Sequence, residues 1–458
     1  MRSSEGAWRA PVGILVALGL LASAQAQEVE LVQRNALGRG VSQGRENTTR
    51  LDVRAGLTAS DNILETAGQE TSDIIATIGT NIDLARQGSR LDYDLLGNLD
   101  WAHYLRNTYR GTLLGSFNGQ ASFQIVPGHV AWAAEESVAQ LVENPTAANT
   151  PDNLQTVSYF TTGPRFDFHL GSATVLQLNG DYSKVSSATS LPGQQNVAST
   201  RYSGGASLVR HLSTGSSLSL TGTTQAVYFD DTTVNQNYHQ NSAFLGYRLS
   251  SSRTQLALSF GGTQLRLPDG NRTGMTVGLD LARRITASST VLLHLSQQTA
   301  DSADLLRMDL SSRLGVLSGL QVTQSTPVEE RGAQASWLFA RERNSMSVSF
   351  DWTHDVGKVD HAFDRSYEVG RVQYSRRIRP VLTLNLSTQY IRQELSELNF
   401  NYNEFDATAA LAWQLEQRIN LSFQYDHMRR TAAGGGVGSF TENRIGLIAT
   451  YRVLGPGS

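Results

Sequence analysis

Polar side chains that could bind a hydrated solute recur at every second residue near the C-terminus. Hydroxyl and amide groups dominate, and a few Asp and Arg side chains add charge. The sets are Ser347, Ser349, Asp351 and Thr353; Arg371, Gln373 and Ser375; Thr383, Asn385, Ser387 and Gln389; and Asn420, Ser422, Gln424 and Asp426. Such groups exchange hydrogen bonds with water and with sugar hydroxyls. The pattern predicts a wall along which neutral or weakly charged solutes, including glycans, could pass.

Any water-filled barrel needs a polar inner wall, so this pattern favours a pore more than it favours sugar specificity. We expect eleven side chains to face the lumen, and we assign none of them a catalytic role. They are Asp92, Asp94, Asp351, Arg371, Gln373, Asn385, Gln389, Gln424, Asp426, Arg444 and Arg452. The sequence indicates no cofactor and no metal.

A hydrolytic or metal-binding site is the alternative chemistry. The chain has nine His residues, and the densest group of His and Asp follows a segment that ends at Trp352. This group comprises His354, Asp355, Asp360, His361 and Asp364. Its members could bind a metal or activate water, and a hydrolase at the barrel rim would use His354 or His361. However, no HExxH or GxSxG spacing is present, and loops that face water are charged in any case.

The elements that position these side chains must be strands, because side chains alternate between two faces at a period of two. In the last segment, Ile445 to Val453, apolar residues alternate with Gly446, Thr450 and Arg452, and Ile448 is the exception. Segments of this kind recur over most of the chain. They begin near Leu51, Ile74, Leu91, Leu113, Val130, Val157, Phe166, Leu176, Tyr202, Leu218, Ala243, Leu256, Met275, Val291, Ala333, Met346, Gly370, Leu382, Phe405, Ile419 and Ile445.

So many alternating segments predict an all-β fold, a transmembrane antiparallel meander β-barrel of the outer-membrane type. At roughly 20 to 24 residues per strand and connection, we expect about 18 strands, within a range of 16 to 20. Short turns, such as Arg379-Pro380 and Glu416-Gln417, should alternate with longer loops, such as 142–153 and 299–327. A secreted soluble β-protein is the alternative, but its sheet edges would need protection.

An export signal precedes the strands. Arg2 and Arg9 precede an uncharged apolar run from Val12 to Ala22, and Ala24-Gln25-Ala26 has the spacing of small residues that signal peptidase requires. We therefore expect a signal peptide at 1–26, cleaved after Ala26, and localisation in the cell outer membrane. A periplasmic lead segment at 27–49, the barrel at 50–453 and a C-terminal tail at 454–458 would follow.

Composition excludes several other classes. The net charge is −3, which gives no reason to expect nucleic acid as a partner. The chain has no Cys, so it has no disulfide, no thiol nucleophile and no lipoprotein anchor.

Aromatic residues near strand ends predict a girdle at the membrane interface. These residues are Tyr104, Trp132, Tyr228, Trp352 and Tyr390.

Several short motifs resemble one family of outer-membrane β-barrel porins that are encoded near exopolysaccharide and capsule export systems. The motifs are Leu57-Thr58-Ala59-Ser60-Asp61-Asn62-Ile63, Ser72-Asp73-Ile74-Ile75, Leu91-Asp92-Tyr93, Gly163-Pro164 and Leu245-Gly246-Tyr247-Arg248-Leu249. The resemblance covers roughly residues 50 to 265. The tail after Leu454 departs from common barrels because it does not end in an aromatic residue.

The resemblance implies a barrel tied to surface polysaccharide, and it supplies no catalytic residues. Its function would be a passive pore or an export component for exopolysaccharide or other hydrophilic solutes. A structural barrel that organises a secretion complex without conducting is the second alternative. The expected partners are outer-membrane lipid, the barrel-assembly machinery, polysaccharide and periplasmic export proteins. For Asp61 and Asn62, a turn-forming role is favoured over ligand binding, because both residue types favour turns.

Overall fold

The computed structural model describes residues 47–144, 147–188, 197–233, 235–301, 303–305, 327–358, 364–396, 399–433 and 438–455. They form a 20-stranded antiparallel sheet in which each strand pairs with the next along the chain. The strands are β1 Thr48–Ser60, β2 Asp73–Arg86, β3 Leu91–Tyr104, β4 Thr112–Val126, β5 Val130–Val142, β6 Leu154–His169, β7 Thr174–Ala188, β8 Ser199–Ser213, β9 Ser216–Phe229, β10 Tyr238–Ser250, β11 Thr254–Leu267, β12 Gly270–Thr286, β13 Ser289–Ala300, β14 Val328–Ala340, β15 Asn344–Gly357, β16 Arg365–Arg379, β17 Leu382–Leu395, β18 Phe400–Gln414, β19 Ile419–Ala433 and β20 Phe440–Leu454; a short helix, η1 Pro151–Asn153, precedes β6.

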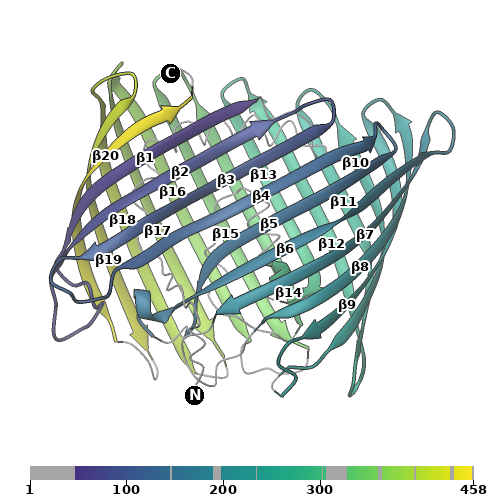
Figure 1. The fold of residues 1–458 in the computed structure, drawn as a ribbon, viewed down its shortest axis with the longest axis horizontal. Helices are drawn as coiled ribbons and strands as arrows, with labels where there is room; N and C mark the ends of the chain where they lie inside the picture. The colour runs from purple at the N-terminus through teal and green to yellow at the C-terminus, as the bar shows by residue number, and fades with distance from the viewer. Residues whose placement is uncertain are drawn as a thin grey trace, which may run out of the picture.

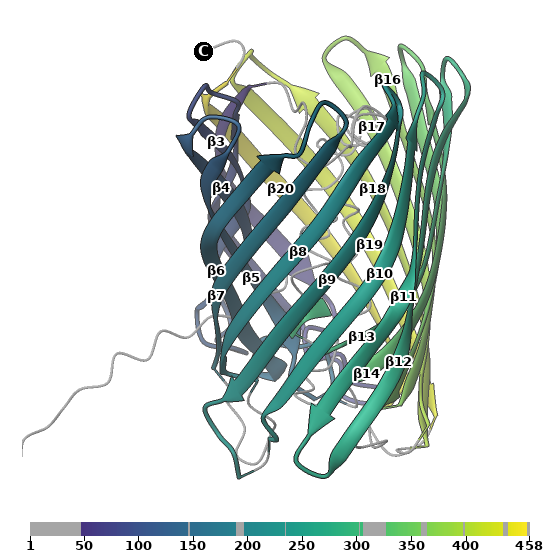
Figure 2. The same ribbon diagram turned by 90° about the vertical axis from the view of Figure 1, so that its right-hand side faces the viewer.

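The sheet closes on itself. β1 pairs with β20 in antiparallel register from Leu51 opposite Leu454 to Ser60 opposite Arg444. Figures 1 and 2 show the resulting barrel, with strands tilted relative to its axis. Closure satisfies the backbone groups of both edge strands, which removes the edges that an open sheet would expose.

The two ends of the barrel differ in the lengths of their connections. At one end, nine turns of two to four residues join each even-numbered strand to the next odd-numbered one. We call this the turn end; β1 begins there and β20 ends there. The longer connections, such as those between β1 and β2 and between β5 and β6, lie at the opposite end, which we call the loop end. Figure 1 shows the turn end at the top.

The two faces of the sheet differ in polarity. On β20, Ile445, Leu447 and Tyr451 are exposed, whereas Gly446 and Ile448, which lie between them, are buried. Each of the other nineteen strands also exposes at least one large apolar side chain, for example Leu57 on β1 and Phe260 on β11. An apolar band of this extent needs a non-aqueous surrounding. The predicted transmembrane antiparallel meander is therefore confirmed.

The strand number is at the upper end of the predicted range. Twenty strands fit because the turn-end connections are so short. The sequence suggested separate segments at Val157 and Phe166, but both belong to β6, which is 16 residues long. The hydrogen-bonded ladder between β6 and β7 is interrupted at Gly163-Pro164, since proline lacks the N–H that a ladder requires. The break weakens the alternation but does not end the strand.

Three of the residues expected in the aromatic girdle, Trp132, Tyr228 and Tyr390, are exposed on the outer face, as a girdle residue must be. The prediction is wrong for Tyr104, whose side chain is 0% exposed and packs inside with Ile63 and Ile75. Tyr104 lies three residues after the outward Trp101, so strand alternation turns it to the inner face.

The strands begin two residues before the expected barrel boundary and end one residue after it. The expected signal peptide and nearly all of the lead segment lie outside the described residues. Among the residues that are described, no helix is both long enough and apolar enough to cross a membrane.

Candidate functional site: the barrel lumen

All eleven side chains that we expected in the lumen lie at alternate positions opposite the exposed apolar face. They come from β3, β15, β16, β17, β19 and β20, and closure of the sheet leaves only β1 and β2 between β20 and β3. Asp92 and Asp94 lie on β3, Asp351 on β15, Arg371 and Gln373 on β16, Asn385 and Gln389 on β17, Gln424 and Asp426 on β19, and Arg444 and Arg452 on β20. The set therefore occupies one arc of the wall.

Three of these residues belong to one polar chain across four strands. Arg371 Nη1 lies 4.0 Å from Asp351 Oδ2, and Arg371 Nε donates to Gln389 Oε1. Gln389 Nε2 then donates to Asp406 Oδ2 at 3.3 Å. Asp406 on β18 was not predicted. The row therefore links charged and amide side chains of four neighbouring strands into one polar network.

Other residues that we predicted in the lumen each contact only one or two neighbouring side chains. Asp426 Oδ1 accepts hydrogen bonds from Thr408 at 2.8 Å and from Gln424 at 2.7 Å. Gln373 Oε1 accepts from Ser347 at 3.0 Å. Arg452 Nε lies 3.5 Å from an oxygen of Asp52. The wall thus divides into local clusters.

Asp92 and Asn385 differ from these residues. Asp92 Oδ1 accepts a hydrogen bond from the backbone N–H of Gly88 at 3.0 Å, so its carboxylate also holds the turn between β2 and β3. Asn385 is buried, and its side-chain oxygen and nitrogen both lack a hydrogen-bond partner among the described residues.

Buried ion pairs that the sequence did not reveal line the loop end. Arg444 Nη2 lies 2.6 Å from Glu442 Oε2 and 3.9 Å from Glu65 Oε1. Arg430 Nη2 lies 2.6 Å from Glu404 Oε2. The Arg430 guanidinium also lies over the Tyr402 and Phe440 rings. Buried charges are stable only when paired in this way.

The connection between β1 and β2 folds into the barrel at Glu65. It belongs to the segment between β1 and β2, adopts a left-handed φ of 53°, and is buried. The backbone N–H of Asn149, in the connection between β5 and β6, donates to Glu65 Oε2 at 3.0 Å. Burial raises the pKa of Glu65 to about 7, although Arg430 and Arg444 act in the opposite direction. Two connections therefore meet against β20 inside the loop end.

The motif residues Asp61 and Asn62 hold the same region together. Asn62 Nδ2 donates to the carbonyl oxygens of Thr66 at 2.9 Å and Thr441 at 3.0 Å. Asp61 accepts hydrogen bonds from the backbone N–H and the side-chain Nδ2 of Asn443, both at 2.7 Å. These contacts tie the connection after β1 to β20.

A third connection reaches across the lumen. The described residues after β13, Asp301 and 303–305, are buried against strands far from β13 in the sequence. Arg201 on β8 lies 2.8 Å from Asp301 Oδ2 and 3.1 Å from Asp304 Oδ2. Tyr238 on β10 donates to Asp301 at 2.8 Å, and Tyr159 on β6 donates to Asp304 at 3.1 Å.

The loop end and the middle of the barrel therefore differ. Four clusters of buried apolar side chains lie inside the loop end. One joins β5 to β7 with β13, β14 and the segment 303–305, and the others lie on β16 to β18, on β2 to β4 with Ile63, and on β9 to β11. On the inner wall nearer the turn end, by contrast, Asp280 is 64% exposed and His294 is 44% exposed, although their side chains are only 2.6 Å apart. The described residues thus narrow the lumen at the loop end and leave a solvent-exposed inner wall between there and the turn end.

The proposed hydrolytic cluster is not assembled by its described members. His354 lies on the outer face of β15, where its ring stacks on Trp352 with centroids 6.2 Å apart. Its Nδ1 is 2.9 Å from Ser366 Oγ. Asp355 lies on the opposite face and pairs with Arg365 at 2.6 Å. Asp364 accepts a hydrogen bond from Gly357 N at 2.7 Å.

Asp360 and His361 lie outside the described residues. Within the described ranges, no group of three or more His, Asp or Glu side chains is arranged to hold a metal ion.

No protein-family model matches this chain, and no curated protein matches it. Three solved structures share its general shape at very low sequence identity. The siderophore receptor PirA from Pseudomonas aeruginosa is 9% identical, with 89% of this chain and 81% of that chain covered and a TM-score of 0.45. The FrpB iron transporter from Neisseria meningitidis is 8% identical, with 89% and 82% covered and a TM-score of 0.45. PirA from Acinetobacter baumannii is 8% identical, with 90% and 81% covered and a TM-score of 0.46.

The closed antiparallel sheet and its apolar outer face decide the class of protein. The chain is an outer-membrane-type β-barrel. Signals for part of its lumen were present in the sequence: Glu404 and Asp406 flank the outward Phe405, so alternation turns both carboxylates inward. The burial of Glu65 had no such signal, because it depends on how one connection folds against another.

Proposed function

We propose that this barrel is a passive pore of the outer membrane for hydrophilic solutes, and that surface polysaccharide is among them. The observation that carries the proposal is the polar inner wall that remains exposed, of which Asp280 and His294 are the clearest members. The apolar outer face supports the membrane location. Short turns face the periplasm in barrels of this type, so the loop end would face outward.

The chemistry of the wall supports a broad range of solutes. Amides, hydroxyls and paired charges on β15 to β19 present hydrogen-bonding groups without one dominant sign of charge. Such a wall replaces hydration contacts for a passing sugar at little cost. The link to polysaccharide export rests on the resemblance described above, and periplasmic export proteins would then be partners.

A non-conducting barrel that organises a secretion complex is the second candidate. The packing of Asp301 and 303–305 against Arg201, Tyr238 and Tyr159 favours it, because these residues occupy lumen space at the loop end. In this alternative, the charged contacts inside the barrel stabilise a closed structure and do not guide a solute.

Liposome swelling with sugars of graded size separates the two candidates. Purified protein, reconstituted after refolding, should admit small sugars faster than larger ones and should make empty liposomes permeable. Arg371→Gln and Asp426→Asn should change the rates for charged solutes more than those for neutral sugars, because each variant removes one charge from the wall and keeps a hydrogen-bonding side chain there. A folded barrel that admits no sugar would support the structural alternative.

We propose no catalytic role. The described members of the His354 cluster are divided between the two faces of β15 and are engaged by Trp352, Ser366 and Arg365. The outer-membrane lipid and the barrel-assembly machinery complete the proposed partners.

A further inference from the structure

Two arginines face each other across the sheet at the turn end, one on β12 and one in the turn before β11. Arg284 on β12 donates its backbone N–H to the carbonyl oxygen of Arg253 at 2.8 Å. This bond extends the ladder by one position, because Thr254, the first residue of β11, pairs with Arg283. Arg253 and Arg284 are therefore directly opposite each other. On its other side Arg284 pairs with Thr290, which is buried, so this face is the inner one.

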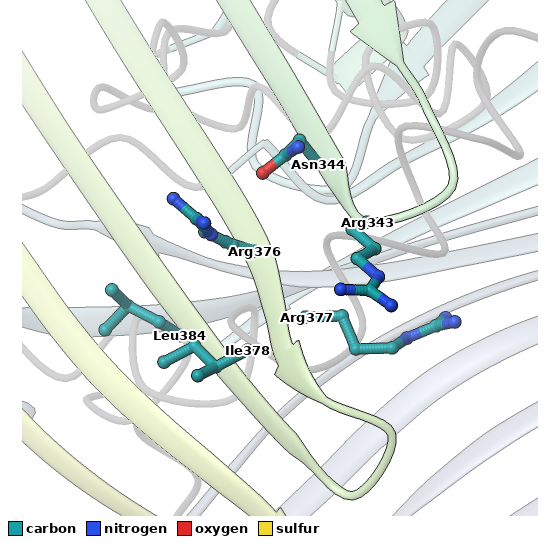
Figure 3. Close-up of a pocket in the computed structure, with 6 residues that line it drawn as sticks. All are labelled: Arg343, Asn344, Arg376, Arg377, Ile378 and Leu384. Carbon is teal, nitrogen blue, oxygen red and sulfur yellow. The ribbon is translucent and has the colours of Figure 1, made fainter.

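The same arrangement recurs between β15 and β16. Arg377 donates its backbone N–H to the carbonyl oxygen of Arg343 at 2.8 Å. The bond lies one position beyond the pair of Asn344 and Arg376. Figure 3 shows the side chains of Arg343 and Arg377 on the same side of β16, opposite to Arg376. Arg377 comes four residues after Gln373, so strand alternation turns it towards the lumen.

A fifth arginine lies at the same level of the barrel. Arg248 on β10, like Arg284 on β12 and Arg377 on β16, is the third residue from the end of its strand. Its neighbour Ala257 pairs in turn with Asp280 on the inner wall, so Arg248 also faces the lumen. All five arginines are exposed to solvent. We call the arc that they form the arginine collar; its members are Arg248, Arg253, Arg284, Arg343 and Arg377.

The protein does not neutralise the arginine collar. Within the described ranges, no carboxylate forms an ion pair with any of its five members. The turn-end connections from β8 to β17 contain a single acidic residue, Glu342. By contrast, a third arginine pair at this end, Arg418 and Arg452, has Asp52 at 3.5 Å from Arg452. Like charges directly opposite each other destabilise a sheet, and a bound anion would remove that repulsion.

The position of the collar favours a chain-like anion. A partner protein that docks on the turns would meet Arg253 and Arg343 and would not need the arginines on the strands. A small anion would be saturated by one or two guanidinium groups. Five cations spread over β10 to β16, facing the lumen, suit a polymer whose successive charges bind at several points. Guanidinium groups bind carboxylates through two parallel hydrogen bonds, so acidic sugar units fit this arc.

Deeper in the lumen, the wall carries charges of both signs. Asp280 lies four residues before Arg284 and is 2.6 Å from His294. Arg371 lies 4.0 Å from Asp351. An anionic chain is therefore attracted at the mouth and is not held along the whole wall. Binding that permits entry without trapping the solute is what conduction requires.

We propose that the arginine collar recruits an acidic polysaccharide from the periplasm into the lumen, with its guanidinium groups bound to carboxylates on successive sugar units. The inference rests on the proposed function, because it names the substrate class of the same pore. It also gives the direction of transport, since the polysaccharide enters at the turn end and leaves at the loop end.

Isothermal titration calorimetry of the refolded protein in a nonionic detergent tests the collar without requiring conduction. The probes are oligogalacturonate, which is acidic, and a neutral malto-oligosaccharide of equal length. Wild type should bind oligogalacturonate in preference, and its affinity should fall as the salt concentration rises. The double variant Arg284→Gln, Arg377→Gln should bind it about tenfold more weakly or worse, since each lost guanidinium removes charge-assisted hydrogen bonds.

Arg283→Gln with Arg376→Gln is the matched control. Each altered residue directly precedes a collar residue on the same strand, so this variant removes the same charge at the same level from the outer face. All four side chains are exposed, and neither variant should affect folding. The control should keep wild-type affinity for oligogalacturonate. Equal weakening by both variants would overturn the collar, as would equal affinity of wild type for the two sugars.

Two further measurements exclude other occupants. Arg253→Gln with Arg343→Gln should weaken binding as the strand variant does. A loss in this turn variant alone would place the site on the turns, where an acidic protein could dock, and would overturn the luminal collar. Displacement of oligogalacturonate by citrate at an equal concentration of carboxylate would show a site for small anions and overturn the polymer.

Single-channel conductance, measured in parallel, separates the collar from the pore itself. Oligogalacturonate should block wild type at a lower concentration than malto-oligosaccharide does, and the strand variant should lose this difference. Conductance without any preference for the acidic sugar would overturn the collar and leave the pore standing. Preferential binding of oligogalacturonate without conductance would overturn the pore and leave the collar as a binding site.

Discussion

Arg54 on β1 reaches across β2 to Asp100 on β3. Its Nε lies 2.6 Å from Asp100 Oδ1, and the two side chains are only 4% and 2% exposed. Arg54 also donates to Asn81 on β2 at 2.6 Å. The residue between them in the sheet is Gly79, which pairs with Arg54 on one side and with Asp100 on the other. The ion pair can span three strands because Gly79 has no side chain.

Gly79→Ala should break this arrangement. A Cβ at Gly79 would lie 1.9 Å from Asp100 Oδ1 and 2.5 Å from the Leu99 carbonyl oxygen, so both a side chain and a backbone group would have to move. We expect a loss of about 2–4 kcal/mol in the free energy of unfolding, close to the cost of breaking a buried ion pair. Urea unfolding in lipid vesicles measures it.

Gly222→Ala is the matched control, because a Cβ there would meet nothing within 4 Å. Its stability should equal that of wild type. Equal stability of the Gly79 and Gly222 variants would show that the pair does not need the gap that Gly79 provides.

Removing one partner of the pair should cost more than removing both. Arg54→Met leaves the Asp100 carboxylate buried without its cation and should destabilise the barrel by about 3–5 kcal/mol. Arg54→Met with Asp100→Leu replaces both charges by apolar groups and should recover most of that loss. A double variant as unstable as the single one would contradict this explanation.

The contact between Arg201 and Asp301 should hold the connection after β13 in place. Arg201→Met leaves Asp301 and Asp304 without their buried cation. We expect amide hydrogens at 301–305 to exchange faster by about tenfold or more, since hydrogen bonds to charged groups contribute roughly 1.5–3 kcal/mol each. Hydrogen-exchange mass spectrometry measures the rate.

Arg210→Gln, on the outer face of the same strand, should leave that exchange unchanged. If the segment also narrows the lumen, Arg201→Met should raise conductance in the same preparation. Wild-type exchange at 301–305 in the Arg201 variant would show that other contacts hold the segment.

Glu65 should make stability depend on pH. Burial raises its pKa from 4.5 to about 7, so the folded chain keeps this proton to a higher pH than the unfolded chain. Below about pH 4.5 the contribution is fully present, and it is lost as the pH rises to about 7. At about 1.4 kcal/mol for each pKa unit, the loss is roughly 3–4 kcal/mol.

Glu65→Gln keeps an acceptor for the Asn149 N–H and removes the titration. The difference in unfolding free energy between wild type and this variant should therefore shift in the variant's favour between pH 4.5 and pH 8. A difference that stays constant over this range would mean that Glu65 does not titrate there.

His354 and Ser366 should not be catalytic. Their side chains are 2.9 Å apart, but the ring face of His354 packs on Trp352 and the nearest predicted carboxylate, Asp355, lies on the other face of the strand. His354→Ala and Ser366→Ala should leave sugar permeability unchanged. Hydrolysis of an ester substrate by wild type that either variant abolishes would refute this view.

The sequence predicted the fold because one side of each strand must face lipid. Ile445, Leu447 and Tyr451 show this constraint in its simplest form, and their exposure is as expected. The same rule applied strictly would have placed Tyr104 inside, since Trp101 three residues earlier faces outward. The error came from reading residue type in place of position.

The ion pairs were harder to predict because they depend on the register in which neighbouring strands pair. The face of the strand on which a side chain lies does not determine its partner. Arg54 and Asp100 are 46 residues apart, and they meet only because β1, β2 and β3 pair in one particular alignment. Contacts such as Glu65 with Arg444 require in addition that a connection folds back into the barrel. No periodic pattern in the sequence encodes either event.

Single-channel conductance of the refolded mature protein in a planar bilayer, with oligosaccharides added, tests the central claim most directly. The proposed pore predicts stable stepwise conductance that oligosaccharides block reversibly. A folded, membrane-inserted barrel that conducts no ions would contradict it and would identify the packed loop end as a closed one.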